Sequence, residues 1–196
     1  MADGFPKDMR GADWDEVFAR QAKRADLVPE WLDAIALHAG ERVLEVGCGP
    51  GFVTLMLAER VGPTGLVHAV DPSADALANL ARRQAERGFD NICRIVADAT
   101  TLADDLQADA ALATMVLHHV DDPAALLANI AHLLRPGARL LVAEFDPDGP
   151  CEFGPPREMR IAAAEVKRWL EAAGFSGVEE RRQTAEDYVV IGGVPM

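Results

Sequence analysis

The stretch Val43-Leu44-Glu45-Val46-Gly47-Cys48-Gly49-Pro50-Gly51 decides how the rest of this sequence folds. It begins with strand-forming apolar residues, continues through three alternate glycines and leads into an apolar helical pattern from Phe52. This order predicts a short buried strand, a tight turn and the start of a helix. Glycines let the turn approach a ligand closely, and free N–H groups at the helix start attract an anionic group. The stretch therefore predicts a ligand-binding loop.

Strand and helix patterns alternate along the rest of the chain. Apolar runs predict strands at 42–46, 66–70, 91–97, 109–115 and 139–145. Helical patterns occur at 27–38, 50–60, 73–87, 122–134 and 159–173. Pro136 and Gly137 predict a turn before the fifth strand, and the runs 178–182 and 188–191 are expected to pair as an antiparallel hairpin. Such alternation is typical of an α/β fold with a parallel sheet covered on both faces.

The glycine spacing separates two classes of nucleotide-binding fold. The dinucleotide fingerprint is G-x-G-x-x-G, in which the third glycine packs the helix against the strand. Gly47 and Gly49 fit that pattern, but its sixth position is Phe52. The third glycine is instead Gly51, and the acidic Glu45 lies two residues before the first. This E-x-G-x-G-x-G run resembles the first motif of the class I S-adenosylmethionine-dependent methyltransferases.

Three later segments extend the resemblance in the order found in that family. They are Asp71, Asp98-Ala99 and the run from Leu133 to Leu140, so the resemblance covers residues 41–145. It implies a Rossmann-like doubly wound sheet of seven strands, mostly parallel with an antiparallel C-terminal strand. It also implies S-adenosyl-L-methionine as the cofactor. The Leu-His-His segment at 117–119 is similar to that of small-molecule methyltransferases of the ubiquinone/menaquinone-biosynthesis type.

Asp71 is the acidic residue placed to bind a ribose. It ends the second predicted strand, 22 residues beyond Gly49, a spacing at which a carboxylate reaches ribose hydroxyls. It also precedes a helix, so a capping role is the alternative. The resemblance favours ribose, and it implies that Asp98 accepts a hydrogen bond from the adenine amino group while the Ala99 N–H donates to the ring. The cofactor contacts implied by the family are Glu45, Gly47, Cys48, Gly49, Gly51, Asp71, Pro72, Asp98, Ala99 and Met115.

His118 and His119 follow the fourth predicted strand and are the candidate catalytic residues. A general base is needed only when the acceptor atom carries a proton of high pKa. The alternative is that one histidine forms the wall of the cofactor pocket and the other bonds locally. Adjacent side chains in a strand-like segment point to opposite sides, so we expect no metal site from these histidines and Asp121.

The net charge and the cysteine content indicate which binding partners and which cellular location to expect. The chain has 196 residues and a formal net charge of −13 at pH 7. Nucleic acids and anionic membranes are bound by clustered Lys and Arg, so we expect neither partner. Cys48, Cys93 and Cys151 are isolated, which predicts reduced thiols and a cytoplasmic protein. No apolar stretch approaches the length of a membrane span.

Two units are expected, an N-terminal arm or lid at 1–26 and a cofactor-binding methyltransferase domain at 27–196. The arm is charged and contains few core residues apart from Trp14 and Phe18. The predicted function is S-adenosylmethionine-dependent methyl transfer to a small-molecule substrate. The alternatives are a non-catalytic module that binds the cofactor or S-adenosylhomocysteine, and an NAD-dependent oxidoreductase, which Phe52 disfavours. A monomer and a homodimer both remain open.

Overall fold

A computed structural model describes residue 9 and the ranges 11–103 and 105–196. Part of the predicted arm, residues 1–8 and 10, therefore lies outside the described residues. The strands are β1 Arg42–Val46, β2 Leu66–Asp71, β3 Ile92–Val96, β4 Ala108–Thr114, β5 Leu134–Phe145, β6 Ser176–Arg182 and β7 Asp187–Gly193. The helices are α1 Trp14–Ala22, α2 Leu27–Ala34, α3 Phe52–Val61, α4 Ala74–Arg87, α5 Pro123–Leu133 and α6 Ala163–Ala172, with 3-10 helices at Leu117–His119 and Arg157–Met159.

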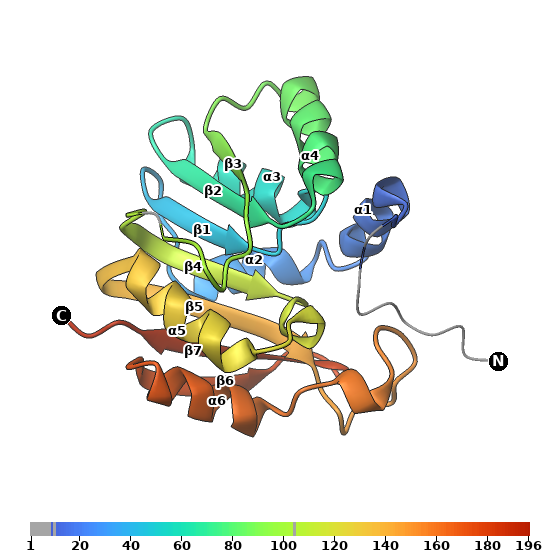
Figure 1. Cartoon of the computed structure of the whole chain (residues 1–196), viewed down its shortest axis with the longest axis vertical. Helices are drawn as coiled ribbons and strands as arrows, with labels where there is room; N and C mark the ends of the chain where they lie inside the picture. Colours follow the sequence, from blue (N-terminus) through green and yellow to red (C-terminus); the bar gives the residue numbers. More distant parts are fainter. Residues whose placement is uncertain (1–8, 10, 104) are drawn as a thin grey trace.

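The strands form one seven-stranded sheet in the order β3-β2-β1-β4-β5-β7-β6 (Figure 1). All neighbours from β3 to β5 are parallel, and β7 runs antiparallel to both β5 and β6. The predicted doubly wound sheet with an antiparallel C-terminal strand is confirmed. Since β1 and β4 are neighbours while the chain leaves β1 toward β2, the strand order reverses between them. Ligands bind at such a switch point, beyond the carboxyl ends of the strands.

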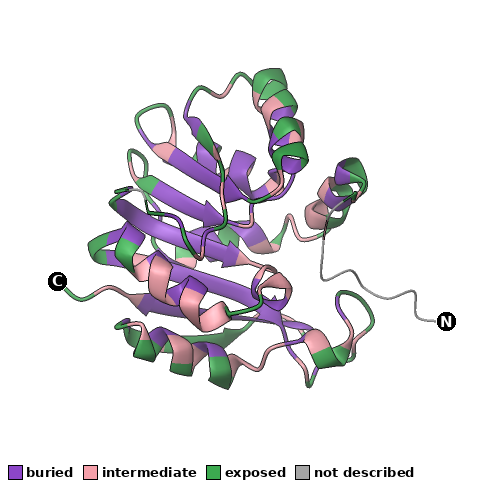
Figure 2. Cartoon of the chain, in the orientation of Figure 1, coloured by how far each residue is buried: buried purple, intermediate pink, exposed green. Residues whose placement is uncertain are grey.

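Alternate side chains of each strand enter separate hydrophobic cores. Val43 packs in the core that also contains α2, α3 and α4, whereas the next residue, Leu44, packs in the core with α5 and α6. The central strands are buried on both faces, as Figure 2 shows. A strand covered on both faces has to be apolar at nearly every position. This requirement explains why the strands of the sheet read as continuous apolar runs in the sequence.

Two glycines shape the loop between β1 and α3. Gly47 has φ +68°, and a Cβ there would lie 2.3 Å from Val116 Cγ2. Gly51 has φ +91°, and its Cβ would lie 2.3 Å from Leu80 Cδ1 of α4. Real Cβ contacts are never this short, and left-handed backbone is costly for residues with a Cβ. The third glycine therefore brings α3 and α4 together.

Several element boundaries differ from those predicted; α6, for example, begins at Ala163 and not near position 159. The chain continues through Pro136 and Gly137 as an irregular part of β5, where pairing with β4 jumps from Ala108–Leu134 to Ala110–Arg139. Gly137 has φ +79°, the value expected at the third position of a type II turn, so the predicted turn lies within this irregular part of β5. Helix α2 ends at Ala34 rather than near position 38. It stops because Ala36 takes a left-handed φ of +46° and Leu37 N bonds back to Leu32 O at 2.9 Å.

Replacing Gly51 with Ala should destabilise the fold more than the same change at Gly88. Gly88 also has a left-handed φ, +69°, but nothing lies within 4 Å of a Cβ there. The control should lose about 1–2 kcal/mol for its backbone conformation alone. Gly51→Ala should lose about 1–3 kcal/mol more, because its Cβ collides with Leu80. Urea unfolding of both variants measures the difference. Equal losses of unfolding free energy would show that α4 shifts at no cost to make room for the Cβ.

Candidate active site

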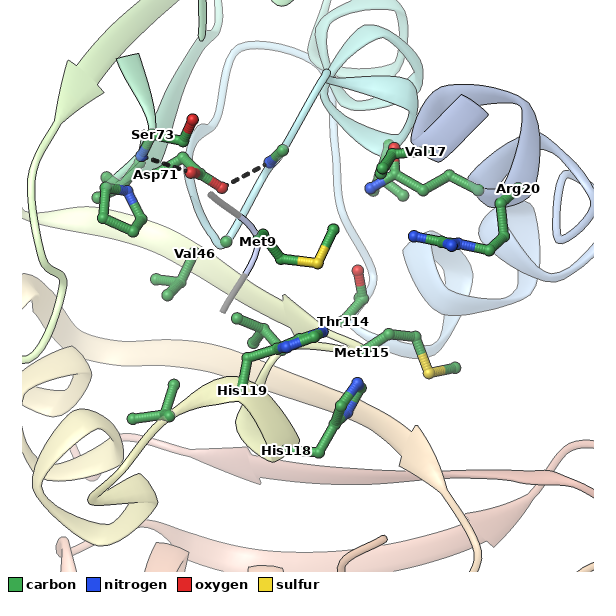
Figure 3. A pocket seen from close by; sticks show the side chains of 18 of the residues that line it. Met9, Val17, Arg20, Val46, Asp71, Ser73, Thr114, Met115, His118 and His119 are labelled. Carbon is green, nitrogen blue, oxygen red and sulfur yellow. Dashed lines mark hydrogen bonds between the residues drawn. The ribbon is translucent and has the colours of Figure 1, made fainter. Parts of the chain in front are cut away.

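A cavity of about 1310 Å³ lies beyond the carboxyl ends of the parallel strands (Figure 3). Its walls are the ends of β1, β2 and β4, the loops that follow them, the 3-10 helix at Leu117–His119 and the described part of the arm. Residues at the end of β5 and the start of β7 extend it across the sheet. Pockets for one small ligand measure about 300–1,000 Å³. The cavity therefore has room for more than one molecule.

Asp71 connects the end of β2 to the glycine loop. Its Oδ2 accepts a hydrogen bond from Gly49 N and its Oδ1 accepts one from Ser73 N, each at 2.8 Å (Figure 3). Burial raises the pKa of Asp71, and these two backbone bonds oppose the rise. The N-cap of α4 is Ser73, whose Oγ accepts from Ala76 N at 3.2 Å. Asp71 itself is not the cap, so its carboxylate shapes the cavity wall.

The other predicted residues that line the cavity come from several strand ends. Gly47, Pro72, Asp98, Ala99 and Met115 all contribute to the wall. The exposed Asp98 accepts a hydrogen bond from Thr100 N at 2.8 Å, whereas Ala99 is buried. Met115 holds a left-handed φ of +55°, an uncommon conformation for a bulky residue and typical of functional sites. Contact between these residues and the cofactor stays a prediction.

Glu45, Cys48 and Gly51 are not among the residues that line the cavity. Glu45 is buried behind the loop, where Thr54 Oγ1 donates to its Oε2 at 2.5 Å. Burial raises the pKa of Glu45 to about 8, although the Thr54 bond opposes the rise. The group is therefore mostly neutral at pH 7. Glu45 and Gly51 thus support the loop from within the core, and a direct cofactor contact for them stays a prediction.

His118 and Glu144 form a buried pair in the cavity region. His118 Nδ1 lies 2.8 Å from Glu144 Oε2, and the two side chains are 1% and 0% exposed. His118 and His119 both line the cavity, with ring centroids 4.3 Å apart (Figure 3). The expectation that the two rings point to opposite sides is wrong. The segment is a 3-10 helix rather than an extended strand, so consecutive side chains are not alternated.

Four residues that the sequence did not suggest line the far end of the cavity. The Arg24 guanidinium lies 4.8 Å from the ring centroid of Phe145 and 5.6 Å from that of Phe153. Asp187 is buried at the start of β7, and its Oδ2 accepts from Thr184 Oγ1 at 3.2 Å. These residues belong to no local motif. They come from the α1–α2 connection, β5, the loop after it and β7, and only the folded sheet brings them together.

The described residues also bear on metals and membranes. Within that part of the chain, no group of three or more His, Cys, Asp or Glu side chains could hold a metal ion. None of the described helices is both long enough and apolar enough to cross a bilayer.

The site and the fold place the chain in a family. Residues 37–186 match the family described as methyltransferase domain, which is more than half of the chain. The chain therefore belongs to the methyltransferase domain family, whose members use S-adenosylmethionine. The predicted family, fold and cofactor class are confirmed, and the oxidoreductase alternative is excluded. Gly47, Gly49 and the Asp71 carboxylate line the cavity beside the switch point, where a bound cofactor would lie, and their contact with it stays a prediction.

Several known proteins are similar to the chain. A ubiquinone biosynthesis O-methyltransferase from Cupriavidus pinatubonensis is 32% identical over 175 residues, covering 79% of this chain and 68% of that protein. The aklanonic acid methyltransferase DauC from a Streptomyces species is 29% identical over 157 residues, covering 76% and 71%. A solved S-adenosylmethionine-dependent methyltransferase from Aquifex aeolicus shares the fold, with a TM-score of 0.80 and 22% identity over 93% of this chain and 98% of that one.

Some relatives are much longer than the matched region. An uncharacterised protein encoded in a Streptomyces fradiae transposon is 39% identical over 121 residues. The matched region is 60% of this chain but only 34% of the length of the relative. Similarity in such cases extends to the methyltransferase domain and not to the whole protein.

Asp71→Ala should weaken the binding of S-adenosylhomocysteine by about tenfold or more. A hydrogen bond that involves a charge contributes about 1.5–3 kcal/mol, and 1.4 kcal/mol is tenfold in affinity. The variant should also lose stability, because the Gly49 and Ser73 N–H groups lose their acceptor. Asp122→Ala is the matched control, since Asp122 caps α5 and does not line the cavity. Calorimetry on folded protein measures the affinity of both variants for S-adenosylhomocysteine. An unchanged affinity in Asp71→Ala would contradict the ribose role.

Proposed function

We propose that the protein catalyses transfer of the methyl group of S-adenosylmethionine to an oxygen atom of a small molecule. The observation that carries this proposal is the reach of the cavity, from Asp71 at the end of β2 to Asp187 at the start of β7. In the sheet order these strands are separated by four inter-strand spacings of about 4.8 Å, or about 19 Å in all. That length accommodates a cofactor and an acceptor placed end to end.

For this reaction the main contribution of the protein is to position the two reactants. The cofactor supplies an electrophilic methyl group on a sulfonium, and transfer is an in-line displacement. The chain therefore has to hold donor and acceptor in line and keep water out. The loop with Gly47 and Gly49 and the Asp71 carboxylate hold one end of the cavity, while Phe145 and Phe153 provide apolar walls at the other.

His118 is the residue we assign as the base for an acceptor that carries a hydroxyl. When Nδ1–H donates to Glu144, Nε2 becomes the basic nitrogen of the ring. As His118 takes up the proton of the acceptor hydroxyl, the neighbouring Glu144 stabilises the imidazolium that forms. Glu144 acts as a positioning residue, because it lies wholly inside the core. This arrangement supports the proposal of an oxygen acceptor, whose proton has to be removed.

The names of the relatives support a small-molecule acceptor. The Cupriavidus and Streptomyces proteins are named for ubiquinone biosynthesis and for aklanonic acid. Screening small hydroxylated metabolites with methyl-labelled cofactor tests the proposal directly. Label should appear in a product of low molecular mass, at a rate that depends on protein concentration. If S-adenosylhomocysteine binds but no acceptor in the panel is labelled, the chain is better described as a non-catalytic binding module.

Replacing His118 with Gln should lower kcat by about 10²–10⁴ for an acceptor with a high-pKa hydroxyl. Glu144→Gln should lower kcat less, because it removes the partner of the base and not the base itself. Rates of methyl transfer measured with labelled cofactor for the wild type and both variants check this. An unchanged rate in His118→Gln would rule out its role as base.

We further infer that the described part of the expected arm, residues 11–26, covers the cavity as a lid. Helix α1 rests on the body through Asp15, which pairs with Arg82 at 2.8 Å and also with Arg83. Phe18 packs edge-on against Phe52 with centroids 5.4 Å apart. Exposed ion pairs contribute only about 0–1 kcal/mol, so these contacts permit opening.

Limited proteolysis measures whether the arm behaves as a lid. Cleavage within 1–26 should slow severalfold when S-adenosylhomocysteine is added, because the helix side chains that line the cavity would then contact the ligand. Cleavage at exposed sites of α6 serves as the internal control. Equal protection of the arm with and without ligand would contradict the lid, and protection that grows with protein concentration would indicate a contact between subunits.

A further inference from the structure

The end of the cavity farthest from the glycine loop contains a set of side chains whose polar groups are not fully bonded. We call Arg24, Phe145, Phe153, Thr184 and Asp187 the acceptor subsite. They line the cavity beyond His118, whose ring centroid lies 5.8 Å from that of Phe145. The inference below rests on the proposed methyl transfer and asks which acceptor this subsite selects.

Arg24 carries one unsatisfied hydrogen-bond donor. Its Nε is buried and has no hydrogen-bond partner among the described residues. The guanidinium lies over the Phe145 and Phe153 rings in cation–π contacts, and the Asp187 carboxylate acts on it electrostatically. Burial lowers the pKa of Arg24 from its ordinary value and Asp187 opposes the fall, but a guanidinium stays protonated in proteins. An oxygen atom of a ligand at this position would complete its hydrogen bonding.

Asp187 carries the matching unsatisfied acceptor. The residue is 2% exposed, and its Oδ1 has no partner among the described residues, although Oδ2 is bonded to Thr184. The neighbouring acidic residues, in contrast, are paired with arginines. Glu186 accepts from Arg160 Nη1 at 2.5 Å, and Asp146 is paired with Arg182. Those carboxylates serve the structure, which leaves Asp187 as the acid of this region that still lacks a bond. A buried polar group without a partner is costly, so a ligand that supplies one binds more tightly.

We propose that the acceptor is an uncharged, hydroxylated aromatic molecule, and that Arg24 and Asp187 determine this specificity. Arg24 Nε–H donates to an oxygen of the acceptor, and Asp187 Oδ1 accepts from one of its hydroxyl groups. Arg24 and Asp187 carry opposite charges, and Arg160, which also lies over the Phe145 ring, is paired with Glu186, so the charges around the subsite balance and favour a neutral ligand over an ion. The Phe145 ring is near both Arg24 and His118, so the subsite adjoins the proposed base. In this proposal the acceptor carries two oxygen substituents on a ring system, one held by the subsite and one presented to His118.

Calorimetry in the presence of saturating S-adenosylhomocysteine tests this specificity. The probes are 2,6-dihydroxynaphthalene, 2,6-dimethoxynaphthalene, which has no hydroxyl to donate, and the cation tyramine. Wild-type protein should bind the dihydroxy compound about tenfold or more tightly than the dimethoxy compound, as expected for a hydrogen bond to a charged group. Asp187→Asn should abolish most of this preference, because its amide can donate as well as accept. Arg24→Lys should weaken both naphthalenes about fivefold or more, since it keeps the charge but loses Nε–H.

Matched changes on the surface separate these effects from general damage. Arg168→Lys and Asp90→Asn alter exposed side chains away from the cavity and should leave both affinities unchanged. If Asp187→Asn folds poorly, Arg24→Lys on the more exposed α1–α2 connection still decides the question. The proposal is overturned if wild-type protein with bound S-adenosylhomocysteine shows no preference for the dihydroxy compound, or if it prefers tyramine. Failure to bind S-adenosylhomocysteine at all would instead contradict the proposed function.

Discussion

The carboxylate of Asp71 joins the end of β2 to the loop after β1, beside the switch point of the sheet, and the shape of the cavity depends on that link. It accepts the N–H groups of Gly49 and Ser73, one from the glycine loop and one from the turn into α4. Without this acceptor, two buried or part-buried N–H groups would lose their partner, at about 1–3 kcal/mol each. The bond therefore sets the loop at a fixed distance from β2. The same carboxylate also lines the cavity, where it faces whatever ligand lies beyond these strand ends.

Four acidic side chains near the strand ends have four different environments. Glu45 is mostly neutral behind the loop, Asp71 is bound by backbone N–H groups, and Glu144 is paired with His118. Asp187 keeps one oxygen without a partner. Buried acids are tolerated only when they are neutral or hydrogen-bonded, so an incompletely bonded one is the exception that suggests a ligand. The net charge of −13 thus says little about the site, whose acids differ in partners rather than in number.

Much of the fold could be predicted because its signals are local. A buried strand is a run of apolar residues, and a glycine loop before a helix is a short motif, so 43–51 and the alternation after it predicted the sheet. Parallel strands end at one edge, which also placed Asp71 and Asp98 correctly along the cavity wall. One local pattern misled, because the adjacent histidines turn as a 3-10 helix and not as an extended strand.

The sequence by itself determined the family, the alternation of strands and helices along the chain, and the glycine loop between β1 and α3, since each depends on neighbours within a few residues. Only the tertiary structure decided that Glu45 supports the loop from inside the core, through Thr54 of α3. It alone decided that Glu144 pairs with His118. It also decided that Arg24 and Asp187, far apart in the sequence, line the same cavity. Burial and hydrogen bonding of a side chain depend on residues far along the chain, and no local pattern encodes them.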